Sequence, residues 1–75
     1  MYLLEPLQTE LFDPVREGIV EMAIAPQQPG RVRVMGVSWA AQPYIQIEQP
    51  ALVAGISVKV VGRRGNTLLV RPLVR

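Results

Sequence analysis

The side chains that most often perform catalysis are missing from this sequence. It contains neither histidine nor cysteine, so it offers no Ser–His or Cys–His pair and no imidazole or thiolate metal ligand. Carboxylates are the remaining candidates for acid–base chemistry, namely Asp13, Glu17, Glu21 and Glu48. An ion pair between Glu21 and an arginine of a neighbouring strand would account for that residue structurally. The sequence therefore predicts a protein that is not an enzyme and that uses no cofactor or metal.

Arginine is the residue type most able to form a binding surface. Arg31 and Arg33 alternate with valines, which places both guanidinium groups on the outer face of a strand. Further arginines on two later strands extend the candidate surface: Arg63, Arg64 and Arg71. Three interpretations remain open, namely ordinary solvated strand faces, a track for single-stranded nucleic acid, and a surface for another acidic partner.

A nucleic-acid track would also need aromatic side chains on which bases can stack. Trp39 and Tyr44 are the candidates near the second and third expected strands. Trp39 has the same parity as Val37 and Ala41, so it is equally a candidate for the largest core residue. The segment from Gly62 to Gly65 lacks the length and the Lys-Ser/Thr pair of a phosphate-binding loop, which favours a solvated hairpin.

Composition indicates one small all-β domain. Of the 75 residues, 49% are hydrophobic and 19% are charged, with seven prolines and six glycines. Such a chain suits short strands joined by tight turns, and its lack of cysteine favours the cytoplasm over a secreted, disulfide-stabilised state. The net charge of +2 does not by itself imply a nucleic-acid partner. The longest uncharged run is too short to cross a bilayer, so the chain is expected to be soluble.

Alternating polar and apolar residues, bounded by proline and glycine, predict five strands. Inward-facing side chains include Val20, Met22 and Ile24 in the first strand and Ile56, Val58 and Val60 in the fourth. Gly36 turns the chain between the second and third strands, and a helical turn is possible around Pro50 to Val53. The predicted strands are Glu17 to Ala25, Arg31 to Met35, Val37 to Gln42, Ile56 to Gly62, and Thr67 to Arg71, with a hairpin loop at Arg63 to Asn66.

Residues 1–16 are expected to be a separate N-terminal segment, and residues 17–75 the domain. The leucine spacing fits a short helix from about Glu5 to Phe12 that stops before Pro14. A mobile tail is the alternative. In either case Leu3, Leu4 and Leu7 form a candidate apolar patch for a partner.

Closure into a barrel would remove most of the exposed edges of five short strands. The longest connection lies between the third and fourth strands, where the five-stranded Greek-key barrel called the OB-fold has its crossover. We therefore predict an OB-fold, with an SH3-like barrel as the rival architecture.

The glycine and proline positions resemble those of the soluble C-terminal domain of NfeD-like proteins. The similarity covers about Glu17 to Leu73, and two features of the chain depart from the family pattern: two extra residues in the turn ending at Gly30, and the lack of the transmembrane helices that normally precede the domain. The motifs that carry it are Gly18; Ile24-Ala25-Pro26 with Pro29-Gly30; Gly36 with Trp39; Gly55, Val58, Val60 and Val61; and Gly65, Leu68, Val70 and Pro72.

The resemblance implies an OB-fold interaction module that acts with a stomatin-like, band-7 membrane-associated protein. The proteolytic activity of some family members belongs to a separate domain that this chain lacks, and the family supplies no catalytic residue. The expected protein is thus cytoplasmic, recruited to a membrane through its partner, and of unassigned oligomeric state. The alternative is a single-stranded nucleic-acid binder that uses Arg31, Arg33 and Trp39.

Overall fold

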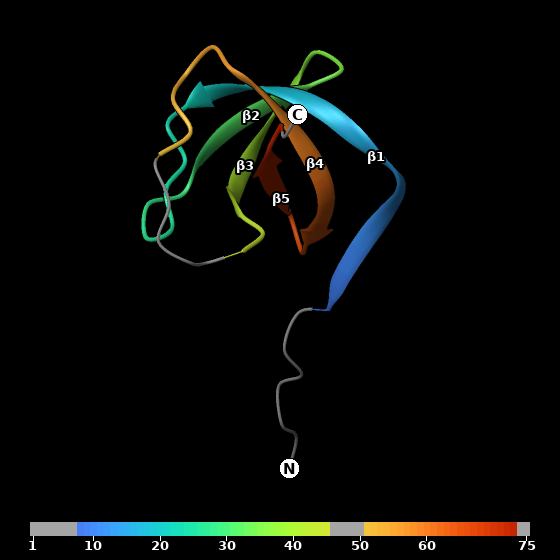
Figure 1. Ribbon diagram of the computed structural model, residues 1–75. Helices are drawn as coiled ribbons and strands as arrows, with labels where there is room; N and C mark the ends of the chain where they lie inside the picture. Colours follow the sequence, from blue (N-terminus) through green and yellow to red (C-terminus); the bar gives the residue numbers. More distant parts are fainter. Residues whose placement is uncertain (1–7, 46–50, 74–75) are drawn as a thin grey trace.

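Five strands form from the alternating segments in the computed structural model, which describes residues 8–45 and 51–73 (Figure 1). These ranges contain no helix, and hence none able to span a membrane. The strands close into a barrel in the order β1-β2-β3-β5-β4, and every neighbouring pair is antiparallel except β3 and β5. This is the OB-fold topology, which confirms the predicted fold class. The strands are β1 (Thr9–Met22), β2 (Gly30–Val34), β3 (Val37–Pro43), β4 (Ser57–Arg64) and β5 (Thr67–Pro72).

Aliphatic side chains from all five strands fill the barrel. Phe12, Val34 and Trp39 are partly buried and pack against this core from one side. None of the described residues places a buried charged or polar side chain in the interior, so the core is held together by apolar burial alone. Its members are Val20, Ile24, Val32, Ala41, Leu52, Val58, Val60, Leu68 and Val70.

The first strand begins well before Glu17. Thr9 to Leu11 pair with the end of β4, so the helix expected to reach Phe12 is wrong for residues 9–12. The pairing register of β1 with β4 shifts between Leu11 and Arg16. Pro14 lies in this irregular stretch, where its missing N–H interrupts no hydrogen bond between the strands. Figure 1 shows the resulting bend, with the first part of β1 leading away from the barrel.

A second irregularity in β1 reverses the orientation expected for Met22. The register with β2 shifts between Val20 and Met22, and an extra residue in a strand moves the following side chains to the other face. Met22 is therefore 57% exposed, whereas Val20 and Ile24 are buried as predicted.

The connection between β3 and β4 lacks the expected helical turn over residues 51–53. Instead Leu52 forms an isolated bridge with Ile24, with N···O distances of 2.9 and 2.8 Å. Pro50 lies outside the described residues. Ile56, expected to face inward, precedes β4 and is partly exposed, because β4 begins at Ser57.

Both hairpin turns consist of two residues, whereas the sequence predicts four at Arg63 to Asn66 and Gly36 alone between the second and third strands. Arg63 and Arg64 belong to β4, leaving Gly65 and Asn66 as the turn. Between β2 and β3 the turn consists of Met35 and Gly36, both in the left-handed region with φ of 51° and 82°. Positive φ at both central residues is the signature of a type I′ turn, which favours Asn-Gly over Met-Gly.

Replacing Met35 with asparagine is therefore expected to stabilise the domain. Asn tolerates the left-handed conformation better than methionine does, and the methionine side chain is 85% exposed, so little packing is lost. We expect an increase in the free energy of unfolding of about 0.5–1 kcal/mol, measured by urea denaturation. A decrease would show that the Met35 side chain contributes packing that outweighs the backbone strain.

Candidate interaction surface

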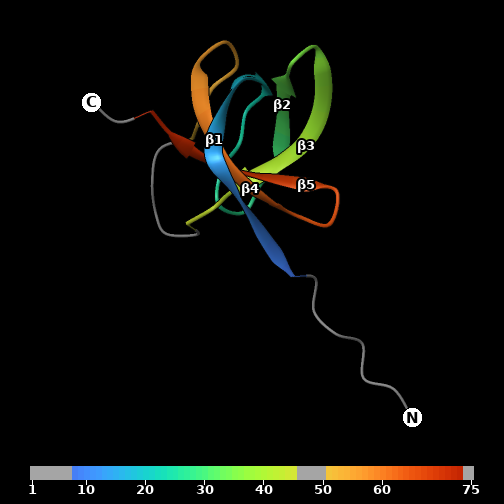
Figure 2. The same ribbon diagram turned by 90° about the vertical axis from the view of Figure 1, so that its right-hand side faces the viewer.

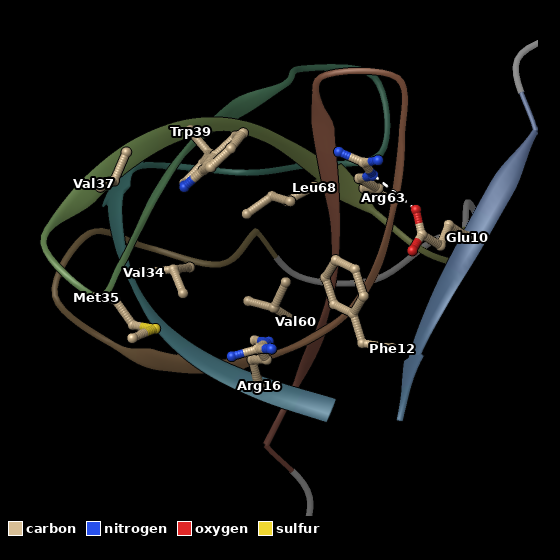
Figure 3. A pocket seen from close by; sticks show the side chains of 10 residues that line it. All are labelled: Glu10, Phe12, Arg16, Val34, Met35, Val37, Trp39, Val60, Arg63 and Leu68. Atoms are coloured by element: carbon tan, nitrogen blue, oxygen red, sulfur yellow. Dashed lines mark hydrogen bonds and ion pairs between the residues drawn. The ribbon is translucent and has the colours of Figure 1, made fainter. Parts of the chain in front are cut away.

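A groove of about 340 Å³ opens at one end of the barrel. It lies where the first half of β1, the β2–β3 hairpin, β4 and β5 meet. Figure 2 shows the β2–β3 and β4–β5 hairpins as separate projections from the barrel. The groove is mainly apolar, with charged groups at its margin (Figure 3). Its lining residues are Glu10, Phe12, Arg16, Val34, Met35, Val37, Trp39, Val60, Arg63 and Leu68.

The groove exposes the end of the core to solvent. Val60 and Leu68 are buried core residues and form its base, between Phe12 on β1 and Trp39 on β3. Met35 stands at its margin on the hairpin turn and is almost fully exposed. An apolar surface of this shape, bordered by charges, is typical of a site for a ligand or a protein segment.

Side-chain contacts hold the first part of β1 in place beside the groove. The Arg63 Nε lies 2.9 Å from Glu10 Oε1, and both residues are exposed. Arg64 donates to the Thr9 hydroxyl from Nε at 3.1 Å and from Nη2 at 2.9 Å. These contacts, with the backbone pairing, align Thr9 to Leu11 along β4 and so position Phe12.

The candidate residues from the sequence do not form one surface. Trp39 pairs with Val32 in the ladder and Arg33 pairs with Ser38, so Trp39 faces inward while Arg31 and Arg33 face outward. Of the predicted residues, the groove brings together Trp39 and Arg63. Arg64 contacts Thr9, Arg71 lies opposite Lys59 on the outer face, and Leu3, Leu4 and Leu7 lie outside the described residues.

The arginines of β2 already have partners on the barrel surface. Arg31 donates from Nε to the Ser38 hydroxyl at 2.9 Å and from Nη2 to the Ser38 carbonyl at 3.1 Å. Arg33 donates to the Gly36 carbonyl at 3.1 Å, and its Nη2 lies 2.5 Å from Glu21 Oε2. The predicted pairing of Glu21 with an arginine is confirmed, and these contacts leave less of either guanidinium available for a ligand.

The same network lowers the pKa of Glu21. A hydrogen bond with the Ser38 hydroxyl is the main cause, and the guanidinium groups of Arg33 and Arg31 act in the same direction. Partial burial opposes them without reversing the shift.

This network predicts a small stability difference between wild type and Glu21→Gln that depends on pH. The pKa of Glu21 is lower in the folded state, so its carboxylate stabilises the fold above the unfolded carboxyl pKa of about 4.3. This stabilisation is lost as pH falls through the folded pKa. Chemical denaturation should give wild type a slightly higher free energy of unfolding than Glu21→Gln at neutral pH. Near pH 3 the two values should converge. A difference that grows on acidification would contradict the assigned direction of the shift.

The sequence interpretation missed most of the groove. Phe12 and Arg16 share the even-numbered face of β1 with Val20, a signal that is visible only once the strand is extended back through Pro14. The sequence pattern places Met35 at the end of a strand, whereas the structure places it in the β2–β3 turn with Gly36. No cluster of three or more carboxylates occurs among the described residues that would suit a metal ion.

The closed five-stranded barrel, with an apolar groove at one end, makes this chain an OB-fold domain. The model of the NfeD-like C-terminal, partner-binding domain family matches residues 16–72. The chain therefore belongs to this family, as its glycine and proline pattern indicated.

A solved structure has the same fold. It is the soluble domain of a membrane protein implicated in regulation of membrane protease activity from Corynebacterium glutamicum. The two are 22% identical, with a TM-score of 0.69, and the match covers 80% of this chain and 90% of the other. No curated protein sequence matches the chain.

Proposed function

We propose that this domain is a non-enzymatic interaction module whose partner is a stomatin-like, band-7 membrane-associated protein. Membership of a partner-binding family supports an interaction role, and the exposed apolar groove is the observation that carries it. The structural neighbour is itself part of a membrane protein, which agrees with a role at a membrane. In this proposal the domain is cytoplasmic and its partner brings it to the bilayer.

Binding rather than catalysis agrees with the chemistry of the site. Among the described residues that line the groove, Glu10 is the one carboxylate, and it is exposed and paired with Arg63. The groove therefore offers apolar area and charge, which are the components of a recognition surface.

The nucleic-acid alternative lacks a continuous surface. A single strand would need arginines and a stacking platform on the same face, whereas Trp39 lies on the inner face and Arg31 and Arg33 on the outer face. The interaction with a protein is therefore the better-supported function.

The test is direct binding to the purified band-7 protein of the same organism, reconstituted in detergent and immobilised on a sensor surface. We expect saturable binding that survives nuclease treatment and changes little between about 50 and 200 mM salt. A single-stranded DNA oligonucleotide serves as the comparison ligand. Absence of binding to the band-7 protein would overturn the proposed partner, and steeply salt-dependent binding to DNA would favour the alternative function.

A further inference from the structure

We infer that the groove binds an extended apolar segment of a partner protein, which adds as a strand to the open edge of β1 and presents a carboxylate to Arg16. This inference rests on the proposed interaction function, for which it names the surface and the chemistry of the bound segment. Three features carry it: a strand edge and a guanidinium group that none of the described residues pairs with, and a strained methionine at the margin of the groove.

The open edge is set by the pairing of β1. One edge of this strand pairs with β4, whereas pairing of the other edge with β2 begins only at Ile19. Within the described part of the chain no strand covers that second edge from Thr9 to Glu17. Unpaired N–H and C=O groups beside an apolar groove are what an incoming extended segment needs, because main-chain hydrogen bonds supply affinity and alternate side chains enter the groove.

The groove can accept those alternate side chains. Val60 and Leu68 form an apolar base, and Phe12 and Trp39 stand on opposite sides of it (Figure 3). In an added strand every second side chain would point toward this base, while the intervening ones would face solvent. The expected ligand therefore alternates apolar and polar residues.

Charge in the groove favours an acidic segment. Arg63 is paired with Glu10, whereas Arg16 makes no hydrogen bond or ion pair with any of the described residues. Arg16 occupies an inward-facing position of β1, in line with Phe12 and Gly18, and its guanidinium group lies at the groove (Figure 3). One unpaired cation beside apolar surface is complementary to one carboxylate on an otherwise apolar segment.

Met35 supports a binding role for the same groove. Its φ of 51° is unfavourable for a large side chain, and asparagine or glycine would form the turn at lower cost. Because the side chain is 85% exposed, the folded domain gains little packing from it in return. A flexible thioether at the groove margin would instead pack against a bound segment.

The experiment selects ligands from random twelve-residue peptides displayed on phage, using the intact chain as bait. Selected peptides without tryptophan are synthesised and titrated while the emission of Trp39, the sole tryptophan, is recorded. We expect alternating apolar residues with one or more acidic residues, and a saturable change in Trp39 emission. Failure to select peptides, or selected peptides that leave Trp39 unchanged, would overturn the inference.

Charge variants test the assigned contact. Arg16→Gln is expected to weaken the acidic peptide about ten-fold, while Lys59→Gln, which removes the same charge from the outer face of β4, leaves affinity within about two-fold. Arg16→Glu should bind a peptide with lysine in place of the acidic residue better than the original peptide. If Arg16→Gln and Lys59→Gln weaken peptide binding equally, Arg16 acts only through the net charge of the domain. The proposed contact between Arg16 and the carboxylate of the peptide would then be overturned.

A structural role for Arg16 predicts a different outcome. An inward-pointing charge can also prevent open edges of two copies from pairing. In that case Arg16→Val would form dimers, detected by analytical ultracentrifugation, and no acidic peptide would be selected by the wild type. That pair of results would overturn the inference.

Failure of the inference and failure of the proposed partner are distinguishable. If the band-7 protein binds wild type, Arg16→Gln and Met35→Asn with equal affinity, the partner is correct and the groove is not its site. If acidic peptides bind the groove but the band-7 protein does not bind, the groove assignment holds and the proposed partner is wrong.

Discussion

Gly30→Ala is expected to destabilise the domain strongly. A Cβ atom at position 30 would lie 2.2 Å from the carbonyl oxygens of both Met22 and Ala23, which are backbone atoms with no freedom to rotate away. Relief requires β2 to move away from β1 at the first residue of β2, which begins at Gly30 and pairs there with Ala41 of β3. We expect a loss of at least about 3 kcal/mol, at the upper end of overpacking effects.

This loss is large for a chain of 75 residues, whose total stability is expected to be about 4–11 kcal/mol. The measurement is urea denaturation followed by far-UV circular dichroism, with Gly36→Ala as the matched control. A Cβ atom at Gly36 meets nothing within 4 Å, so that variant incurs only the left-handed backbone cost of about 1–2 kcal/mol. Equal losses in the two variants would show that the close approach at Gly30 is relieved by small movements.

Ile24→Ala is expected to have the other large effect. The Ile24 side chain is completely buried in the core cluster, and its backbone bridges to Leu52 across the long β3–β4 connection. Truncation leaves a cavity in a core with few large residues, at a cost of about 3–4 kcal/mol. We also expect faster amide exchange at Leu52, whose N–H donates to the Ile24 carbonyl.

Ile19→Ala is the matched control because it makes the same change at a nearby isoleucine of β1 whose side chain is 51% exposed. We expect its free energy of unfolding to lie within about 0.5 kcal/mol of wild type. A loss at Ile19 comparable to that at Ile24 would indicate that the outer face of β1 is covered in solution.

Much of the barrel follows from local pattern. Alternation from Arg31 to Val34 determines which face of β2 is buried, and the pairing of Glu21 with Arg33 follows from antiparallel neighbours with opposite charges. The length of the connection predicts the crossover between β3 and β4, and the observed strand order agrees with it. The spacing of hydrophobic residues, the residues typical of turns and the need to close exposed sheet edges are sufficient to predict these features.

The irregular parts of β1 could not be predicted in the same way. The spacing of leucines before Leu11 fits a helix, and Pro14 argues against a continuous strand, yet pairing with β4 extends the strand to Thr9. A register shift also turns Met22 outward. Such irregularities depend on long-range pairing, which overrides local propensity.

The groove was beyond sequence reasoning because it is formed by ends of elements rather than by their faces. Phe12, Met35 and Leu68 are far apart in sequence and come together because β1, the β2–β3 hairpin and β5 all contribute to the same end of the closed barrel. The sequence predicts Trp39 to be either a core residue or a stacking platform for a ligand. In the structure its side chain packs against the core and lines the groove, and a role of Trp39 in binding stays a prediction.

The position of β5 between β3 and β4 has a consequence for how the domain forms on the ribosome. The pairing of β5 with both neighbours joins the earlier hairpin to β4, so strands β1 to β4 alone leave the cylinder open between β3 and β4. Residues 67–72 must therefore leave the exit tunnel before closure can begin. Until then the apolar residues of β3 and β4 remain accessible to chaperones, and folding follows synthesis of this segment as one late, cooperative step.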